Sequence, residues 1–323
     1  MTSAIVLAGG LGTRMAPLTA TRPKHLLEVA GEPFLAHQMR WLARNGVTDV
    51  VLATAHLAEA FAPVLGDGGA FGVRLAYAVE PHPLGTGGAL VVAGRLLPDA
   101  APDAPIVVVN GDLFTEHDVR AQVRCLDRAA ATDVVLHLRT VADATAYGSV
   151  VADADGRVTA FVEKSPDPPS LEVNGGTYAV RRRVIDGIRP GVVSLERDIL
   201  PGLVTAGRIT AYREQAVWVD VGSPAALVGL SAAIVVGRGL AAWIDPAAEV
   251  DPAAVVGGGA SVGAGARVAA YAQVLGSVLM PGAVVGAGAS VCDSVLGRGA
   301  RVMPGAILDG GVLGDGEAWP TAE

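Results

Sequence analysis

The chain has 323 residues, of which 51% are hydrophobic and 17% charged, and its formal net charge is −8. This acidic balance argues against binding to nucleic acid, which requires a basic face, although a local cluster of cations can still bind phosphate. The two cysteines, Cys125 and Cys292, are spaced for neither a metal site nor a disulfide framework. No signal peptide is visible, and the longest nearly apolar stretch, 225–237, is too short to span a membrane. We therefore expect a cytoplasmic protein with no membrane partner.

The first part of the chain alternates short apolar runs with segments of helical spacing. The expected strands are 5–7, 50–53, 106–109 and 134–136, and the expected helices are 34–42 and 89–97. Strands that alternate with helices indicate a Rossmann-like α/β fold, a mostly parallel sheet with helices on both faces. Ligands bind such sheets beyond the carboxyl ends of the strands. The loops that follow Leu7, Val79 and Val109 are therefore the expected place of the site.

The last part has a six-residue period instead. Aliphatic residues recur at 250, 256, 262, 268 and 274, and again at 285, 291, 296, 302 and 308. Between them lie mainly glycine, alanine and proline. A hexapeptide period is typical of a β-helix, here expected to be left-handed, with slips near Ser277 and Ser294 that indicate irregular coils. We predict two domains, a catalytic domain of residues 1–236 and a β-helix of residues 237–323.

A glycine-rich segment, Leu7–Arg14, follows the first strand. Its glycines allow backbone N–H groups to converge on phosphate oxygens, and the start of a helix after it would add its dipole. A dinucleotide-binding loop would need a third glycine where Met15 stands, and the P-loop sequence is absent. Arg14 and Lys24 flank a turn, and two fixed cations there would stabilise the charge that accumulates on a leaving pyrophosphate.

Five segments in this order resemble the sugar-1-phosphate nucleotidyltransferase family, and most closely the bacterial mannose-1-phosphate guanylyltransferases. They are Leu7–Arg14 with Pro17-Leu-Thr19 and Pro23-Lys24, Pro83–Gly88, Asn110-Gly-Asp112, Phe161–Lys164, and Trp218–Gly222. The hexapeptide tail also occurs in this family.

The resemblance implies roles for the matching positions. Nucleotide binding falls to Leu7, Gly9, Gly10, Gly12, Thr13, Arg14, Glu80, Gly85, Thr86 and Gly111. Sugar-phosphate binding falls to Gly148, Glu163, Lys164, Asn174 and Gly176. Arg14, Lys24, Asp112 and Lys164 would be catalytic, and Asp112 and Asp220 would bind the metal.

The two aspartates also have a chemical argument of their own. Each stands in or at the end of an apolar segment, where a carboxylate has little structural purpose. Carboxylate and phosphate oxygens suit Mg²⁺, which is the expected cofactor. A sugar phosphate is already an anion and can attack the α-phosphorus directly, so no general base is required.

The base and the sugar follow from different evidence. An ionised Glu80 is acceptor-only and matches the two adjacent donors of guanine, which favours GTP. Mannose 1-phosphate is the expected acceptor by resemblance. Two departures from the family pattern, Pro23-Lys24-His25 and Asn174-Gly-Gly176, keep a glucose, heptose or cyclitol phosphate open.

Three rival functions fit the sequence less well. Acyl transfer by a β-helix usually needs a histidine there, yet all six histidines lie at or before His137. A non-catalytic regulatory subunit predicts loss of Arg14, Lys24, Asp112 or Asp220, and all four are present. A dinucleotide-dependent oxidoreductase would need a glycine in the binding loop where Met15 stands. We also expect the β-helix to support a homo-oligomer.

Overall fold

The structure is a computed structural model that describes residues 2–320. The chain forms two compact units, one built from the segments up to Gly10 and Gln38–Trp218, the other from Leu11–His37 and from Val219 onward. The predicted boundary at 236/237 falls at the end of α7 (Pro224–Gly237) and stays a prediction. Residues 321–323 of the predicted second domain lie outside the described residues.

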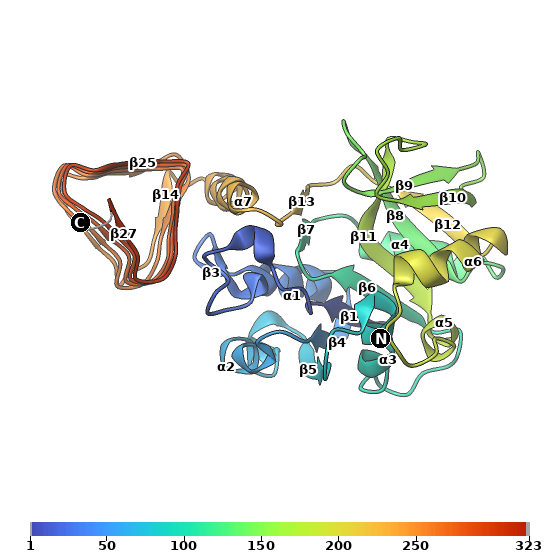
Figure 1. The fold of residues 1–323 in the computed structure, drawn as a ribbon. Coiled ribbons are helices and arrows are strands. Elements are labelled where there is room, and N and C mark those ends of the chain that lie inside the picture. The colour runs from blue at the N-terminus through green and yellow to red at the C-terminus, as the bar shows by residue number, and fades with distance from the viewer. Residues whose placement is uncertain (1, 321–323) are drawn as a thin grey trace. The chain divides into compact units, whose positions relative to one another are not determined.

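A nine-stranded mixed sheet forms the centre of the first unit (Figure 1). Its strands are β1 (Thr2–Leu7), β4 (Val47–Thr54), β5 (Arg74–Val79), β6 (Pro105–Asn110), β8 (Val134–Thr140), β9 (Gly148–Ala152), β10 (Val158–Glu163), β11 (Glu172–Arg181) and β12 (Ile209–Arg213). The neighbours β6, β1, β4 and β5 are parallel, whereas β11 runs antiparallel to β6, β8 and β9. The predicted Rossmann-like fold is confirmed, with an antiparallel extension beyond β6.

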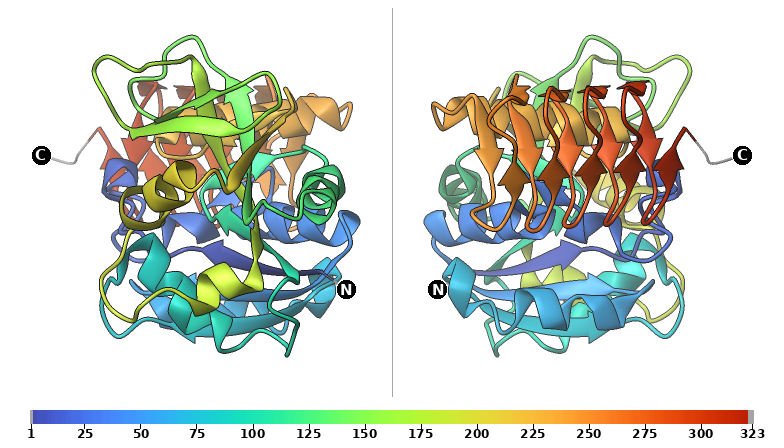
Figure 2. Two further views of the ribbon diagram at one scale, coloured as in Figure 1. Left: turned by 90° about the vertical axis from the view of Figure 1, so that its right-hand side faces the viewer. Right: turned by 90° about the vertical axis from the view of Figure 1, so that its left-hand side faces the viewer.

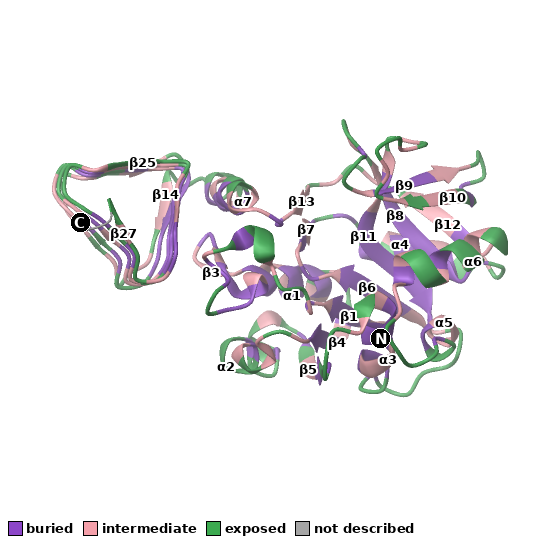
Figure 3. Cartoon of the chain, viewed as in Figure 1, coloured by how far each residue is buried: buried purple, intermediate pink, exposed green. Residues whose placement is uncertain are grey.

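Helices cover both faces of this sheet. The helices of this unit are α2 (Ala62–Leu65), α3 (Gly85–Gly94), α4 (Val119–Arg128), α5 (Arg182–Asp186) and α6 (Leu200–Thr205), with most of α1 (Phe34–Arg44), whereas α7 belongs to the second unit. Strand β8 displays the alternation that this requires, because Val134 and Leu136 pack in one core with α3 whereas Val135 packs against Leu126 of α4. The residues of β6, β8 and β11 are mostly buried, whereas those of β5, β10 and β12 are mostly intermediate or exposed (Figure 3).

The carboxyl ends of the parallel strands meet at one edge, as predicted. Leu7 at the end of β1 pairs with Asn110 at the end of β6 on one side and with Ala53 of β4 on the other. Val79 at the end of β5 pairs with the last residue of β4. The loops that follow these strands therefore start at the same edge and can form one site.

The second unit contains the predicted left-handed β-helix, whose stacked coils Figure 2 shows. Its three sheets consist of β14 (Ala242–Ile244), β17 (Ala260–Val262), β20 (Val278–Leu279), β23 (Val295–Leu296) and β26 (Val312–Leu313); β15 (Glu249–Val250), β18 (Arg267–Val268), β21 (Val284–Val285), β24 (Arg301–Val302) and β27 (Ala318–Trp319); and β16 (Val255–Gly257), β19 (Gln273–Leu275), β22 (Ser290–Cys292) and β25 (Ile307–Asp309). The periodic aliphatic residues point into one core.

The predicted slips near Ser277 and Ser294 have a simple structural cause. Ala242 pairs with Ala260, but Ser261 pairs with Val278, so the later coils are one residue shorter than the first. Both serines are fully buried at the shortened corner. The Ser277 hydroxyl accepts the backbone N–H of Ser294 at 3.1 Å, so it satisfies a group that the missing residue would otherwise leave unpaired.

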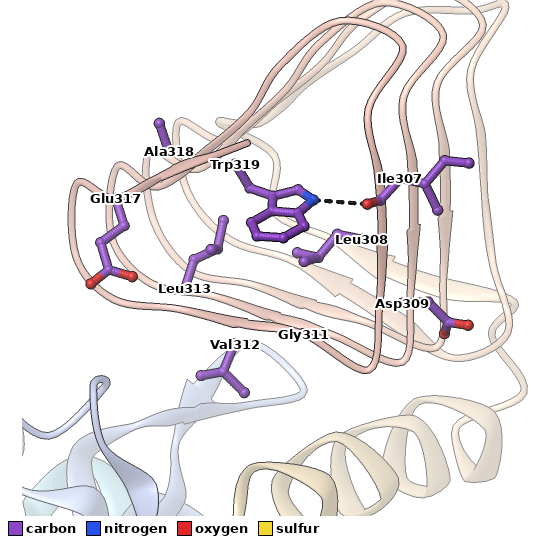
Figure 4. A pocket seen from close by; sticks show the side chains of 9 residues that line it. All are labelled: Ile307, Leu308, Asp309, Gly311, Val312, Leu313, Glu317, Ala318 and Trp319. Atoms are coloured by element: carbon purple, nitrogen blue, oxygen red, sulfur yellow. Dashed lines mark hydrogen bonds between the residues drawn. The ribbon is translucent and has the colours of Figure 1, made fainter. Parts of the chain in front are cut away.

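An open cavity of about 760 Å³ is lined by residues of β25, β26 and β27 in the last described coil (Figure 4). The Trp319 indole lies across it and donates its N–H to the carbonyl of Ile307 at 2.8 Å. Across residues 2–320, each helix falls short of the length or the apolar character needed to cross a membrane.

Candidate active site

A cavity of about 280 Å³ opens at the carboxyl edge of the first unit's sheet. Its lining residues are Leu7, Gly9, Gly10, Glu80, Pro83, Gly85, Thr86 and Ala89. Six of the predicted nucleotide-binding residues are among them, and they come from two separate connections, the loop after β1 and the segment between β5 and α3. The structure therefore brings together the glycine-rich loop after β1 and the start of α3 around one space.

Glu80 is held in this cavity with its carboxylate in a fixed orientation. The backbone N–H of Leu84 donates to Oε2 at 2.9 Å, and a Cβ on Gly9 would lie 3.1 Å from Oε1. The residue is only 7% exposed. Burial raises the pKa of this carboxyl group, while the Leu84 N–H and His82 oppose the rise. A half-satisfied carboxylate at this place can accept further donors from a ligand.

The start of α3 is hydrogen-bonded to Val193, a residue that the sequence analysis did not identify. The carbonyl of Val193 accepts the N–H groups of Gly87 and Gly88 at 2.8 and 3.1 Å. Gly85 has φ of 74°, and a Cβ there would lie 2.6 Å from the same carbonyl. Only glycine fits such a close backbone approach. The signal for this contact is long-range, so local motifs could not reveal it.

The glycine-rich loop departs from expectation at one point. The expected helix does not follow it, because the chain forms only a 3₁₀ turn, Thr13–Met15, before Pro17. Proline lacks the N–H that would continue a helix, which explains the early end. A helix dipole is thus not available at this loop, and phosphate binding there would depend on backbone N–H groups and cations.

Of the residues that were predicted to bind the sugar phosphate, Gly148 and Glu163 pair across β9 and β10. A Cβ on Gly148 would lie 2.8 Å from Glu163 Oε2, so glycine leaves this carboxylate room. Lys164 adopts φ of 44°, which a non-glycine residue rarely does, and its Nζ lies 3.8 Å from Glu163 Oε1. The strand alternation that would separate the two side chains therefore ends at Glu163. Burial raises the pKa of Glu163, and Lys164 lowers it.

Asn174 and Gly176, which were also predicted to bind the sugar phosphate, lie at a break in the register of β11. The break lies between Asn174 and Tyr178. The Asn174 Oδ1 accepts the N–H of Gly176 at 3.1 Å, and a Cβ on Gly176 would lie 2.9 Å from Asn110 Nδ2. The turn thus lies against the end of β6, one residue before the Gly111-Asp112 pair.

The unusual glycine in this turn, Gly175, also has a structural reason. A Cβ at this position would lie 2.5 Å from Nδ1 of the buried His137 ring. The space that a Cβ at this position would take is therefore occupied by an imidazole. The departure does not leave an empty space in the wall of the turn.

Arg14 and Lys24, the two cations predicted to face the leaving pyrophosphate, belong to the second unit. A Cβ on Gly222 would lie 2.5 Å from Arg14 Nη2 and 3.1 Å from Asp220 Oδ1, so the guanidinium and the carboxylate both face this glycine. Lys24 packs over Gly12, where a Cβ would lie 3.2 Å from the lysine Cβ. The structure thus brings Arg14 and Asp220 together, as one predicted site requires.

The same loop is anchored to the β-helix within the second unit. The Thr21 hydroxyl donates to Asp315 Oδ2 at 2.7 Å, and the buried Arg22 forms an ion pair with the same carboxylate. The backbone N–H of Arg298 donates to the other oxygen of Asp315 at 2.9 Å. This anchor fixes the turn between Arg14 and Lys24.

The two predicted metal ligands belong to different units, Asp112 to the first and Asp220 to the second. Across residues 2–320, no group of three or more His, Cys, Asp or Glu side chains forms a self-contained metal site. The donors present are hard carboxylate oxygens, which fit a cation such as Mg²⁺ that takes its other ligands from substrate phosphates and water.

The chain is similar to known proteins over most of its length. The mannose-1-phosphate guanylyltransferase of Mycobacterium tuberculosis is 42% identical over 238 residues, which are 72% of this chain and 65% of that protein. The mannose-1-phosphate guanyltransferase of Schizosaccharomyces pombe is 34% identical over 224 residues, which are 68% of this chain and 61% of that protein. The chain thus spans less than two thirds of the length of these curated relatives.

A solved structure is similar as well. The crystal structure of HddC from Yersinia pseudotuberculosis complexed with GMP-PN is 28% identical, with a TM-score of 0.61 over 72% of this chain and 98% of that one. The model of the nucleotidyl transferase family matches residues 3–235. Because this match covers well over half of its length, the chain belongs to the nucleotidyl transferase family.

Proposed function

We propose that the protein transfers a guanylyl group from GTP to a sugar 1-phosphate, with mannose 1-phosphate as the preferred acceptor, and releases pyrophosphate. The observation that carries the proposal is the Glu80 carboxylate fixed inside a cavity lined by the glycine-rich loop. The names of the mycobacterial and yeast relatives support the sugar and the base. The GMP-PN bound to HddC supports a guanine nucleotide.

Glu80 selects the base through its acceptor character. Guanine offers two adjacent donors on its Watson–Crick edge, N1–H and the 2-amino group, and one carboxylate can accept both. Adenine and uracil offer no such pair. Since hydrogen bonds to a charged group contribute about 1.5–3 kcal/mol, Glu80→Gln should reduce kcat/KM for GTP about 10- to 100-fold, with a much smaller effect for ATP. His82→Gln, an exposed change in the same loop, is the matched control; an unchanged preference for GTP in Glu80→Gln would refute the assignment.

The reaction needs positioning and charge neutralisation rather than a base. A phosphate oxygen of the sugar 1-phosphate forms a bond to the α-phosphorus, and the bond to the β-phosphate breaks, so that pyrophosphate leaves with the electron pair. Lys164 would hold the attacking phosphate, and Glu163 beside it would accept from sugar hydroxyls. Arg14 and Lys24 would stabilise the charge that develops on the leaving group.

We further propose that Asp112 and Asp220 hold Mg²⁺. The two carboxylates would hold the ion, which would supply positive charge to neutralise the phosphates, as is usual in phosphoryl-type transfer. Asp112→Ala and Asp220→Ala should each abolish turnover while the circular-dichroism spectrum and the unfolding midpoint stay near those of the wild type. Full activity of either variant at ordinary Mg²⁺ concentrations would contradict the metal assignment.

The acceptor and the assembly are the less constrained parts of the proposal. A glucose, heptose or cyclitol phosphate is the alternative acceptor, and a catalytically inactive regulatory role is the alternative function. A cytoplasmic location and a homo-oligomer assembled through the β-helix remain predictions. Sedimentation that detects only monomers across the micromolar range would rule out the oligomer.

A further inference from the structure

The Glu196 carboxylate lies between the nucleotide side and the sugar-phosphate side of the first unit. It stands in a single π-helical turn, Leu195–Ile199, that precedes α6. The Thr86 hydroxyl, at the start of α3, donates to Oε2 at 2.6 Å, and the Ser194 hydroxyl donates to the same oxygen at 3.1 Å. Thr86 also accepts the backbone N–H of Leu195 at 2.8 Å. This oxygen is therefore tied to the helix that lines the nucleotide cavity.

The other carboxylate oxygen is tied to the turn in β11. The Tyr178 hydroxyl donates to Glu196 Oε1 at 3.1 Å and accepts from Asn174 Nδ2 at 2.7 Å. Asn174 in turn accepts the N–H of Gly176. Tyr178 is completely buried, so packing fixes the position of its hydroxyl between the half-buried Asn174 and Glu196. Oε1 therefore connects to the turn that carries the predicted sugar contacts.

We propose that Glu196 is a positioning residue that couples the two substrate sites, so that binding of the nucleotide beside Thr86 favours the Asn174 conformation that accepts the sugar phosphate. The inference rests on the proposed function, since it requires two substrates. A carboxylate suits this role because it is acceptor-only and offers both oxygens at once. Such coupling is reciprocal, so the sugar phosphate must favour nucleotide binding by the same factor.

The electrostatics of the neighbouring site agree with this placement. Burial is the largest cause of the raised pKa of Glu163, and the charge of Glu196 adds to that rise. The Glu196 charge therefore acts on the sugar-phosphate side as well as on Thr86. Sequence reasoning did not select Glu196, because its partners are contributed by α3 and β11.

The test uses effects that cross from one site to the other. Thr86→Val removes the hydroxyl on the nucleotide side, yet it should raise KM for the sugar phosphate about tenfold. Tyr178→Phe removes the hydroxyl on the sugar side, yet it should raise KM for GTP by a similar factor. In a Glu196→Gln background each change should add less than twofold, because the bridge is already broken.

Glu196→Gln keeps the size of the side chain but can accept on only one of its two sides, so it should raise both KM values. Asp198→Asn is the matched control, since it makes the same chemical change two residues away, where the carboxylate accepts the backbone N–H of Ser194 and an amide oxygen can still do so. This control should leave both KM values within about twofold of the wild type.

The outcomes separate the inference from the function on which it rests. A wild-type protein that turns over no nucleotide and sugar-phosphate pair would refute the proposed function, and the inference with it. If the wild type turns over its substrates, but Thr86→Val and Tyr178→Phe each change only the KM of the substrate on their own side, and do so additively with Glu196→Gln, the inference alone would be overturned. Crossed and non-additive effects would establish the bridge.

Discussion

The buried His117 gives the molecule a measurable sensitivity to acid. Its ring is fully buried and stacks on His137 with the ring centroids 3.9 Å apart. Nε2 lies 3.0 Å from Gln122 Oε1, and Nδ1 lies 3.0 Å from the Thr115 hydroxyl. The Gln122 amide nitrogen donates to two backbone carbonyls, so its oxygen must accept from the ring. The neutral ring with its proton on Nε2 satisfies every group.

The magnitude follows from the change in pKa on folding. Burial, with a further contribution from His137, lowers the pKa of His117 from 6.5 to about 3. Between these values the unfolded chain binds a proton that the folded protein does not, so stability is complete above pH 6.5 and falls as the pH decreases toward 3. Between pH 8 and pH 5.5, this one histidine should remove about 1.4 kcal/mol from the free energy of unfolding.

Urea unfolding of the wild type and of His117→Gln, measured at pH 8 and at pH 5.5, tests this value. The variant is expected to be less stable at pH 8, because its shorter amide cannot fill the ring's place. Its further loss between pH 8 and pH 5.5 should nevertheless be about 1.4 kcal/mol smaller than that of the wild type. Equal losses in the two proteins would show that His117 does not take up a proton on unfolding, and the argument from burial would be wrong.

Two further predictions concern Gly148 and Gly175, which lie beside residues predicted to bind the sugar phosphate. In Gly148→Ala the new Cβ would lie 2.8 Å from the Glu163 carboxylate. Steady-state kinetics should therefore give a KM for the sugar phosphate that is raised about tenfold, with the KM for GTP unchanged. An equal rise of both KM values would contradict a local effect. Gly175→Ala should lower the free energy of unfolding by about 1–3 kcal/mol, since its Cβ would lie 2.5 Å from His137 Nδ1. The loss should be much smaller in a His137→Ala background, and an additive double variant would argue against this contact.

Much of the fold could be predicted because it depends on local patterns. Strand ends such as Leu7 and Val79 follow from apolar runs closed by polar or glycine-rich segments. The β-helix follows from a sustained aliphatic period, and even its shortened corners at Ser277 and Ser294 appear in the sequence as slips. These features need no knowledge of distant neighbours.

The parts that could not be predicted depend on contacts between distant segments. The Val193 carbonyl that clasps the start of α3, and the Glu196 bridge to Thr86, join segments over a hundred residues apart. Strand alternation also predicts that Glu163 and Lys164 face opposite sides, whereas the positive φ of Lys164 turns the chain at that point. The cost of such a backbone conformation is of the order of 1–3 kcal/mol, and residues that carry it cluster at functional sites.

The central claim is that a sugar 1-phosphate and GTP react here to give a GDP-sugar and pyrophosphate. The most direct measurement is pyrophosphate release with Mg²⁺, in which each common nucleoside triphosphate is combined with mannose 1-phosphate and with glucose 1-phosphate. The account predicts that GTP with mannose 1-phosphate releases pyrophosphate at least about tenfold faster than any other pair. Release with GTP and glucose 1-phosphate, but not with GTP and mannose 1-phosphate, would keep the reaction and change the assigned acceptor. No release with any pair would contradict the account.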